Sequence, residues 1–163
     1  PRALTRVDLR EAAAATAGLL APLAGDMSVA VSCTAGEGCF VLASEDELYR
    51  IVFNLAENAV KYNVEGGSVS LDVERRGARV LLTVEDTGIG IPAEDLPHIF
   101  ERFYRVDKAR SREKGGSGLG LSIVHDAVVA LGGEIGVSAR EGGGTRFAVS
   151  FPAAPEEEGG GSV

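Results

Sequence analysis

The sequence has no hydrophobic run long enough to cross a bilayer and no visible secretory signal. A membrane-spanning helix takes about 20 consecutive apolar residues. The 163 residues, 45% of them hydrophobic, are enough for one domain with its own core. The chain begins at Pro1 rather than at a methionine. We therefore expect a soluble piece of a longer protein, in which membrane segments could lie upstream.

Cysteine and histidine are also scarce. The two cysteines, Cys33 and Cys39, lie in strand-like runs joined by "TAGEG". A cross-strand disulfide is geometrically conceivable, but buried thiols in a reducing compartment are favoured. With no CxxC pair and only two histidines, His98 and His125, the sequence contains no visible zinc site.

Basic residues are outnumbered along most of the chain. The 16 Lys+Arg against 24 Asp+Glu give a net charge of −8, which argues against nucleic acid as a partner. The run Arg105 to Lys114, "RVDKARSREK", is a local exception with five basic and two acidic residues. Alone, such a run is typical of a solvated loop, but this one directly precedes a glycine-rich stretch.

Hydrophobic periodicity predicts one mixed α/β domain over residues 1–152 and a disordered acidic and glycine-rich tail over residues 153–163. Helices are predicted at Val7–Leu23, Ser44–Asn63, Pro92–Ile99 and Gly118–Leu131. Hairpins are predicted from Val29–Cys33 with Cys39–Ala43, from Val69–Val73 with Val80–Val84, and from Glu134–Ala139 with Thr145–Phe151. The long helix opens with Ser44 and Glu47 at the spacing of a capping box.

The long helix carries an apolar stripe with a polar border. The stripe consists of Leu48, Ile51, Val52, Leu55 and Ala59. Asn54, Asn58 and Lys61 cluster beside it, and they offer neutral oxygen ligands to a hard cation and a positive charge to an anion. The alternative is a helix with ordinary polar shoulder residues. Tyr62 lies between the two stripes, where its ring could join the core or cover a flat ligand.

Two glycine-containing motifs could approach a ligand. In "EDTGIGIP", Asp86 offers an acceptor for an exocyclic amine, and Gly88 and Gly90 remove side chains near it; a plain turn is equally compatible. In "GGSGLGLSIV", Gly115 to Val124, the N–H groups and the dipole of a following helix form an anion cradle. This motif is not a Walker A loop, because no Lys-Ser or Lys-Thr pair follows the glycines. A further patch, "GGGTRF" at Gly142 to Phe147, read alone is a hairpin turn.

The order of these motifs is more specific than any one of them. In sequence, "NLAENAVKYN", "DTGIGIP", "IFERFYR", "GSGLGLSIV" and "GGGTRF" resemble the N box, the F box and the three glycine boxes of the ATP-binding catalytic domain of sensor histidine kinases. The resemblance spans about Val7 to Phe151. The family that it indicates belongs to an ATPase superfamily shared with gyrase and MutL. It implies a two-layer α/β sandwich, with helices on one face of a mixed, mainly antiparallel β-sheet, and it implies ATP and Mg²⁺ as cofactors.

At the phosphate end, the resemblance assigns catalytic roles to Asn58, Lys61 and Asn54. Asn58 is similar to the asparagine that holds Mg²⁺, and Lys61 to a lysine that contacts phosphate. Gyrase-like ATPases place a water-activating glutamate where Asn54 stands, which fits phosphoryl transfer rather than hydrolysis. Glu57 lies about 60° from Asn54 around the helix, and we expect it to face away from the site.

At the adenine end, Asp86 is similar to the aspartate that specifies the base, and Tyr62 to the residue that stacks on it. Gly88 and Gly90 make room for the base, and Thr145 resembles a polar residue beside it.

The remaining predicted contacts lie in or beside a mobile ATP lid over about Tyr104 to Ser117. They are Phe100, Phe103, Gly116, Gly118, Leu119 and Gly120. The basic residues of the lid would offset the charge of the triphosphate.

The resemblance predicts transfer of the γ-phosphoryl group of ATP to a histidine in a dimerisation domain that this sequence does not contain. His98 and His125 lack the acidic residue and arginine that follow an acceptor histidine, so we expect both to be structural or surface residues. The partners implied are that dimerisation domain, in the same protein, and a downstream response regulator. We expect this chain to be a monomeric cytoplasmic domain of a membrane-anchored sensor kinase. The isolated domain should bind ATP but phosphorylate nothing alone.

Two other functions are compatible with the motifs. An anti-sigma-factor kinase has the same fold but phosphorylates serine, and the "IFERFYR" and "NAVKYN" motifs favour the sensor kinase over it. A non-enzymatic nucleotide sensor would require a crippled pocket, whereas all the motif residues are present.

Overall fold

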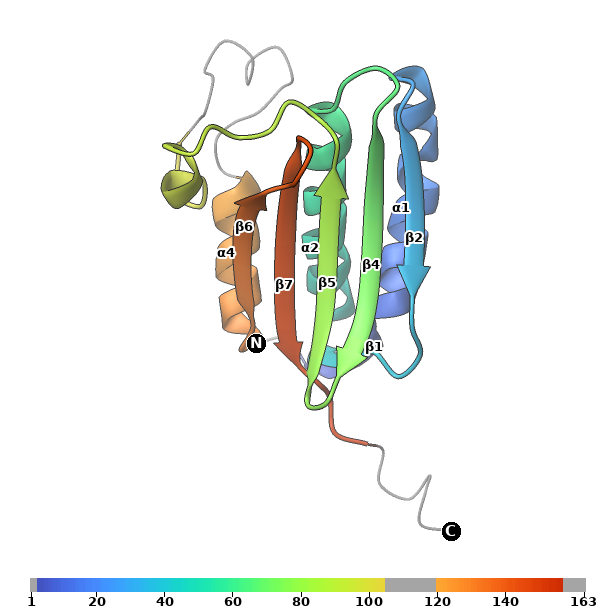
Figure 1. Cartoon of the computed structure of the whole chain (residues 1–163). Helices are drawn as coiled ribbons and strands as arrows, with labels where there is room; N and C mark the ends of the chain where they lie inside the picture. The colour runs from blue at the N-terminus through green and yellow to red at the C-terminus, as the bar shows by residue number, and fades with distance from the viewer. Residues whose placement is uncertain (1–2, 105–119, 157–163) are drawn as a thin grey trace.

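The computed structural model describes residues 3–104 and 120–156. A five-stranded sheet in the order β2-β4-β5-β7-β6 forms one layer, and helices α1, α2 and α4 cover one of its faces (Figure 1). The elements are β1 (Thr5–Asp8), α1 (Leu9–Asp26), β2 (Ala30–Ala35), β3 (Phe40–Ala43), α2 (Glu45–Lys61), β4 (Ser68–Arg76), β5 (Arg79–Asp86), the 3₁₀ helix η1 (Leu96–His98), α4 (Gly120–Ala130), β6 (Glu134–Ala139) and β7 (Thr145–Pro152). This two-layer sandwich confirms the predicted fold class. Within the described residues, no helix combines the length and apolarity needed to span a membrane.

The core lies between the sheet and the helices. The predicted apolar stripe of α2 is part of this core, and none of its residues is more than 2% exposed. On β5 the inward side chains are buried and alternate with half-buried side chains on the other face. Burying one such aliphatic side chain contributes about 1.5 to 3 kcal/mol, so these two periodicities hold the layers together. The hairpins β4–β5 and β6–β7 form as predicted.

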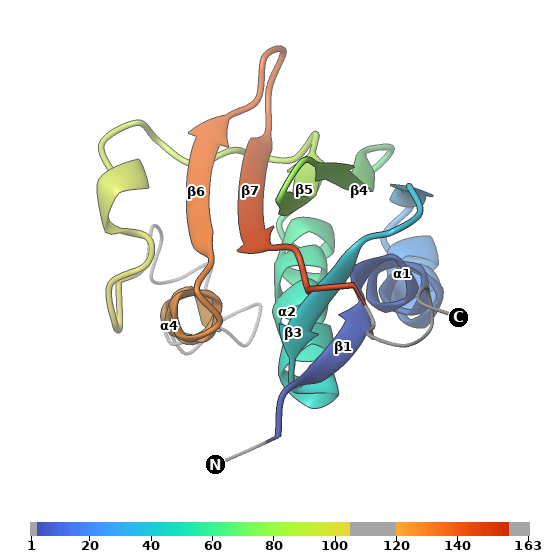
Figure 2. The same ribbon diagram turned by 90° about the horizontal axis from the view of Figure 1, so that it is seen from below.

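The first predicted hairpin is wrong. Strand β2 pairs in parallel with β4, with Cys33 opposite Leu71, and β3 pairs with β1 instead (Figure 2). Alternating side chains identify a strand but do not specify its partner, and here both partners are distant in the chain. Cys33 and Cys39 are free thiols, as favoured, and burial raises the pKa of both.

The first predicted helix begins two residues later than expected. Val7 lies in strand β1, opposite Val41, and the helix starts after Asp8. The Asp8 side chain accepts a hydrogen bond from the Arg10 N–H at 3.0 Å, which satisfies one of the donors exposed at a helix start. At the second helix Ser44 is the N-cap residue, but its side chain makes no capping hydrogen bond among the described residues, so the capping box is not formed as predicted.

Two other boundaries differ from expectation. The helix predicted at Pro92–Ile99 is reduced to the three residues of η1, where Pro97 lies in the first turn and cannot donate a backbone hydrogen bond. The tail predicted from residue 153 begins with residues that pack on the domain. Ala154 is buried and its N–H donates to the Phe40 carbonyl at 2.8 Å, while Arg6 Nε donates to the Pro155 carbonyl at 3.0 Å. Residues 157–163 lie outside the described range.

Candidate nucleotide-binding site

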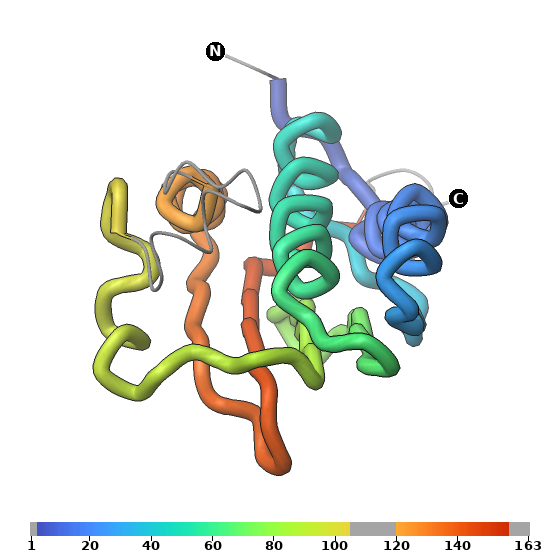
Figure 3. The backbone as a smooth tube through the Cα atoms, turned by 90° about the horizontal axis from the view of Figure 1, so that it is seen from above, coloured from blue at the N-terminus to red at the C-terminus, as the bar shows by residue number. Residues whose placement is uncertain are grey.

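Helices α2 and α4 pack against each other, and the segment that follows β5 runs past one end of α2 (Figure 3). Strand β5 ends there at Asp86, directly opposite Thr145 at the start of β7. The chain then leaves β5 through the turn after Asp86 and passes the C-terminal end of α2. This end of the sheet thus brings Asp86 and Thr145 together, and the turn after Asp86 contacts Tyr62 at the C-terminal end of α2.

Asp86 continues the buried stripe of β5, so its carboxyl group points into the helix layer. Only 7% of the residue is exposed. Burial raises its pKa, and this effect is opposed by hydrogen bonds from the N–H groups of Gly88 and Thr145 and by the positive charge of Arg140. The Gly88 N–H lies 2.9 Å from Oδ1. A carboxylate held in this way is an oriented acceptor at the end of an otherwise apolar stripe.

Glycines allow three chain segments to meet around Asp86. A Cβ atom on Gly88 would lie 2.5 Å from the Tyr62 carbonyl oxygen, and one on Gly144 would lie 1.8 Å from the Asp86 carbonyl oxygen. Gly144 also has a φ of 104°, which side-chain-bearing residues rarely adopt, and Gly90 has a φ of 74°. Gly88 and Gly144 are therefore required for backbone packing, and Gly90 is favoured by its backbone conformation, whether or not a ligand is bound.

A buried polar network that was not predicted joins the end of α2 to this turn. Asn63 is buried, and its Nδ2 donates to the Ser68 carbonyl at 3.0 Å. Thr87 Oγ1 accepts a hydrogen bond from the Ser68 N–H at 2.8 Å. A Cβ atom on Gly67 would lie 2.1 Å from Asn63 Oδ1. The paired glycines in "YNVEGG" were the available signal, but the need for Gly67 depends on neighbours that only the fold supplies.

Arg140 is a further residue of the site region that was not predicted. Its Nη1 donates to the carbonyl oxygens of Glu141 and Gly143, at 3.2 and 3.1 Å. Its Nε lies 3.8 Å from a carboxylate oxygen of Glu85, which also pairs with Arg146. Arg140 therefore holds the loop before Thr145 in place. Nothing in the local sequence distinguishes it from an ordinary exposed arginine.

The polar border of α2 is present as predicted. Asn54, Asn58 and Lys61 are half-buried at the edge of the core stripe. Glu57, which we expect to face away from the site, lies beside Lys61, with its Oε1 3.5 Å from Lys61 Nζ. Neither asparagine side chain has a hydrogen-bond partner among the described residues, which leaves their oxygens available to a ligand.

The donor set suits Mg²⁺ better than a metal that needs many protein ligands. Residues 3–104 and 120–156 contain no group of three or more His, Cys, Asp or Glu side chains that could hold a metal ion. Mg²⁺ keeps several waters and takes one or two protein oxygens together with those of phosphates. A single neutral oxygen from Asn58 fits that mode of binding.

The aromatic residues of the F box separate into two environments. The ring of Phe100 packs against those of His125 and Phe147, with centroids 5.5 and 6.2 Å apart, and so joins this segment to α4 and β7. Phe103 is 69% exposed and has a φ of 64°. His98 is exposed, with Nδ1 2.6 Å from Glu101 Oε2, so both histidines have the surface or structural positions that were predicted.

Tyr62 and the lid complete the predicted set. Tyr62 is half-buried at the end of α2, and its carbonyl accepts a hydrogen bond from the Ile89 N–H at 3.2 Å. Gly120 is exposed and begins α4. Gly116, Gly118, Leu119 and nearly all of the predicted lid lie outside the described residues.

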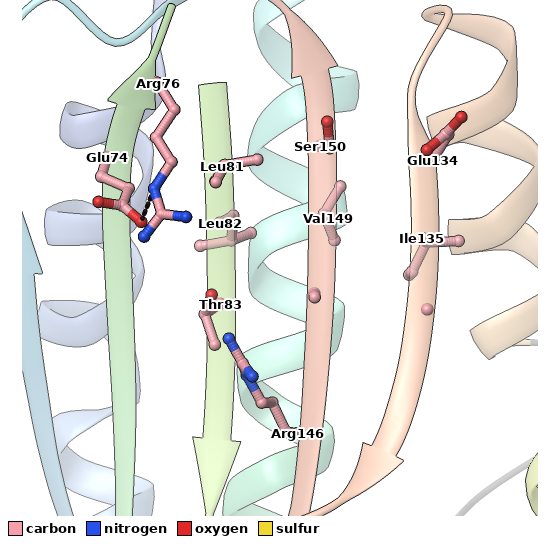
Figure 4. A pocket seen from close by; sticks show the side chains of 12 residues that line it. Glu74, Arg76, Leu81, Leu82, Thr83, Glu134, Ile135, Arg146, Val149 and Ser150 are labelled. Carbon is pink, nitrogen blue, oxygen red and sulfur yellow. Dashed lines mark ion pairs between the residues drawn. The ribbon is translucent and has the colours of Figure 1, made fainter. Parts of the chain in front are cut away.

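A hollow lies on the open face of the sheet (Figure 4). It has a volume of about 390 Å³ and is formed by β4, β5, β6 and β7. Its lining residues are Glu74, Arg76, Leu81, Leu82, Thr83, Glu134, Ile135, Gly136, Arg146, Ala148, Val149 and Ser150. The residues predicted to bind ATP do not line it.

Comparison with known proteins identifies the family. Residues 43–155 match the family described as histidine kinase-, DNA gyrase B-, and HSP90-like ATPase. The chain is 43% identical over 121 residues to the sensor histidine kinase WalK of Bacillus subtilis, covering 73% of this chain and 20% of WalK. It is similar to the structure of the mycobacterial sensor histidine kinase MprB, with a TM-score of 0.80 and 28% identity over 94% of this chain and 99% of that one.

A second similar structure is that of the histidine kinase ThkA in complex with the response regulator protein TrrA. The TM-score is 0.77 with 25% identity, and the match covers 94% of this chain and 43% of that one. The chain spans between about a fifth and a third of the length of the curated relatives. It belongs to the histidine kinase-, DNA gyrase B- and HSP90-like ATPase family, and within that family it is a catalytic ATP-binding domain of the sensor histidine kinase type.

Proposed function

We propose that this domain binds ATP·Mg²⁺ with its adenine on Asp86 and that it transfers the γ-phosphoryl group to a histidine on a dimerisation domain outside this chain. The buried Asp86 carboxylate, oriented by two N–H groups at the end of an apolar stripe, is the observation that carries the proposal. An exocyclic amine is the complementary donor, and adenine supplies one where guanine presents a carbonyl oxygen at the corresponding position.

Residues around Asp86 would form the rest of the base pocket. Gly88 and Gly90 leave the adjoining backbone bare, and Thr145 lies across the strand pair from the carboxylate. The ring of Tyr62 would stack on the base, because Tyr62 belongs to the segment that the turn after Asp86 contacts. From the resemblance we propose that the same ligand is also contacted by Phe100, Phe103 and the glycine-rich segment with Gly116, Gly118, Leu119 and Gly120.

The phosphates would lie along α2. Asn58 would hold Mg²⁺, which when bound neutralises charge on the phosphates. Lys61 would contact a phosphate oxygen. Asn54 is neutral and cannot act as a general base toward water, which supports transfer of the phosphoryl group over hydrolysis.

Because the chain spans only part of the length of its relatives, we propose partners that lie outside this chain. The acceptor histidine would lie in a dimerisation domain of the same protein, and a response regulator would receive the phosphoryl group next, in keeping with the structure of ThkA in complex with its response regulator protein TrrA. We further propose that the isolated domain is monomeric, that it does not autophosphorylate without its histidine-bearing domain, and that it belongs to the cytoplasmic part of a membrane-anchored sensor.

Calorimetric titration with ATP and GTP tests the base pocket. Asp86→Asn replaces one acceptor oxygen with a donor that faces the donor amine, which costs about 1 to 3 kcal/mol in a buried site, or roughly tenfold or more in affinity. Asp72→Asn is the matched control, since Asp72 is an exposed residue of β4 on the open face. ATP affinity unchanged in Asp86→Asn, or GTP bound as tightly as ATP by the parent, would contradict the proposal.

The binding test requires that Asp86→Asn remains folded. The direction of the pKa shift of Asp86 predicts that the variant is not destabilised at neutral pH. Because burial raises this pKa in the folded state, the favourable contribution of Asp86 to stability is full below its ordinary pKa and is lost as the pH rises through the raised value. At neutral pH the ionised group therefore costs folding free energy. Asp86→Asn should melt no lower than the parent at pH 7, and its advantage should shrink as the pH falls.

A further inference from the structure

Lys61 has an anionic partner before any phosphate arrives. Glu57 lies one helical turn earlier on α2, and its Oε1 is 3.5 Å from Lys61 Nζ. The two side chains are 32% and 35% exposed, so both border the core while reaching solvent. Lys61 is also the last residue of α2, where the helix dipole favours a positive charge.

We propose that Glu57 competes with the nucleotide phosphates for Lys61 and thereby makes the site selective for nucleotide whose charge is offset by Mg²⁺. This inference rests on the proposed function, because it takes the α2 border as the phosphate site.

The competition follows from the charges. Lys61 carries a single positive charge and must leave Glu57, at least in part, to contact a phosphate. The Glu57 carboxylate then loses its partner and remains one residue from Asn58, beside an anionic ligand. The Glu57 carboxylate repels metal-free ATP more strongly than it repels ATP·Mg²⁺. The bound Mg²⁺ offsets part of the phosphate charge, and the ion itself is attracted to the carboxylate. Glu57 should therefore weaken binding of metal-free ATP more than binding of ATP·Mg²⁺.

The pair is not needed to hold the helix. Partly exposed ion pairs between residues four apart contribute little to stability, and α2 is fixed by its buried stripe. Glu57→Gln should consequently fold and melt like the parent. Its effect should appear in binding, which a purely structural role for Glu57 would not produce.

Calorimetric titration with ATP, once with MgCl₂ and once with EDTA, tests the inference on the parent, Glu57→Gln, Lys61→Gln and the double variant. We expect Glu57→Gln to bind ATP·Mg²⁺ about two- to fivefold more tightly, in keeping with the modest strength of such a pair. The gain in affinity should be larger for metal-free ATP. The dissociation constant in EDTA divided by that in MgCl₂ should therefore be smaller in Glu57→Gln than in the parent. In the Lys61→Gln background, removal of Glu57 should give a smaller gain, because no lysine is left to release.

Glu74→Gln is the matched control. Glu74 pairs with Arg76 at 3.1 Å on the open face of the sheet, so the same change in charge at that position should leave both dissociation constants unaltered.

Three results would overturn the inference: weaker or unchanged binding in Glu57→Gln, an equal gain in both Lys61 backgrounds, or an unchanged dependence on Mg²⁺. These results differ from failure of the proposed function. If the parent binds ATP in a manner that depends on Asp86 while Glu57→Gln has no effect, only the competition is refuted. If the parent does not bind ATP, or binds it equally well without Asp86, the proposed site is refuted as well.

Discussion

The two ends of strand β5 both have glycine beside them, but for different physical reasons. At the Arg79 end, Gly77 has a φ of 57° in the β4–β5 turn, and a Cβ atom there would meet nothing within 4 Å. At the Asp86 end, Gly88 and Gly144 stand where a Cβ atom would overlap the backbone of another segment. The first glycine allows a turn conformation, and the other two allow close approach of the chain.

The two ends also differ in the polar groups that they bury. The Arg79 end exposes charged side chains around a tight turn and buries no polar group there. The Asp86 end brings the C-terminal end of α2, the turn after β5 and the β6–β7 loop together around a buried carboxylate. Burying a carboxylate is unfavourable unless hydrogen bonds or charges compensate, so its presence at this end of β5 and not at the Arg79 end supports the proposal that the nucleotide binds there.

The comparison is tested most strongly by adding one methyl group at each end. Gly144→Ala combines backbone strain with a clash against the Asp86 carbonyl, and we expect it to lower the free energy of unfolding by more than about 3 kcal/mol. Gly77→Ala adds a methyl group in open space and should cost only about 1 to 2 kcal/mol for its left-handed backbone. Urea unfolding of both variants measures the two losses. Equal losses would show that the two ends are not sterically different.

A second test compares the helix side of the sheet with the hollow on its open face. Asn58→Ala removes the proposed Mg²⁺ ligand without touching the buried stripe, so the fold should survive. If affinity drops roughly tenfold, stabilisation by ATP·Mg²⁺ at about 100 times the parent Kd should fall to about half. Thr83→Ala alters the open-face hollow and should leave that stabilisation unchanged. Thermal melts with and without ATP·Mg²⁺ measure both. The opposite pattern would move the nucleotide to the open face.

The smallest effect concerns the segment that leaves the Asp86 end. Tyr104, at the far end of that segment, donates its hydroxyl hydrogen to Asp95 Oδ1, and this bond raises the pKa of Tyr104 to about 12. Since the phenol is held protonated in the folded state, the bond's contribution to stability is lost only as the pH rises through about 12. Asp95→Asn should return this pKa toward the ordinary tyrosine value of about 10. A ¹³C NMR titration of the tyrosine rings measures the shift, and an unchanged value would show that Asp95 does not anchor the segment.

Periodicity was sufficient to predict α2 with its buried stripe and the two regular hairpins. The assignment of Asn58, Lys61 and Asp86 to one nucleotide site stays a prediction. Strand pairing was not predictable in the same way. Strand β2 and strand β3 each pair with a strand that is not their sequence neighbour, and a parallel pairing such as β2 with β4 leaves no local turn signal.

Residues whose contacts form only in the folded chain could not be predicted from the sequence either. Arg140 clamps the loop before Thr145, and Glu57 turns toward Lys61, but both look like ordinary surface charges in the chain. Gly67 is required because Asn63 and Thr87 crowd it, which depends on how α2 and β5 pack. Local pattern predicts an element and its buried face, whereas the contacts between elements decide which polar residues support the site.

Amide NMR shifts on addition of ATP and MgCl₂ test the central claim most directly, because they report on both ends of β5 in one titration. The account predicts saturable shifts for the amides of Thr87, Gly88, Gly90 and Thr145 and none for the turn between Arg76 and Arg79. Shifts confined to that turn, or no shift near Asp86 at saturating ATP, would contradict the account.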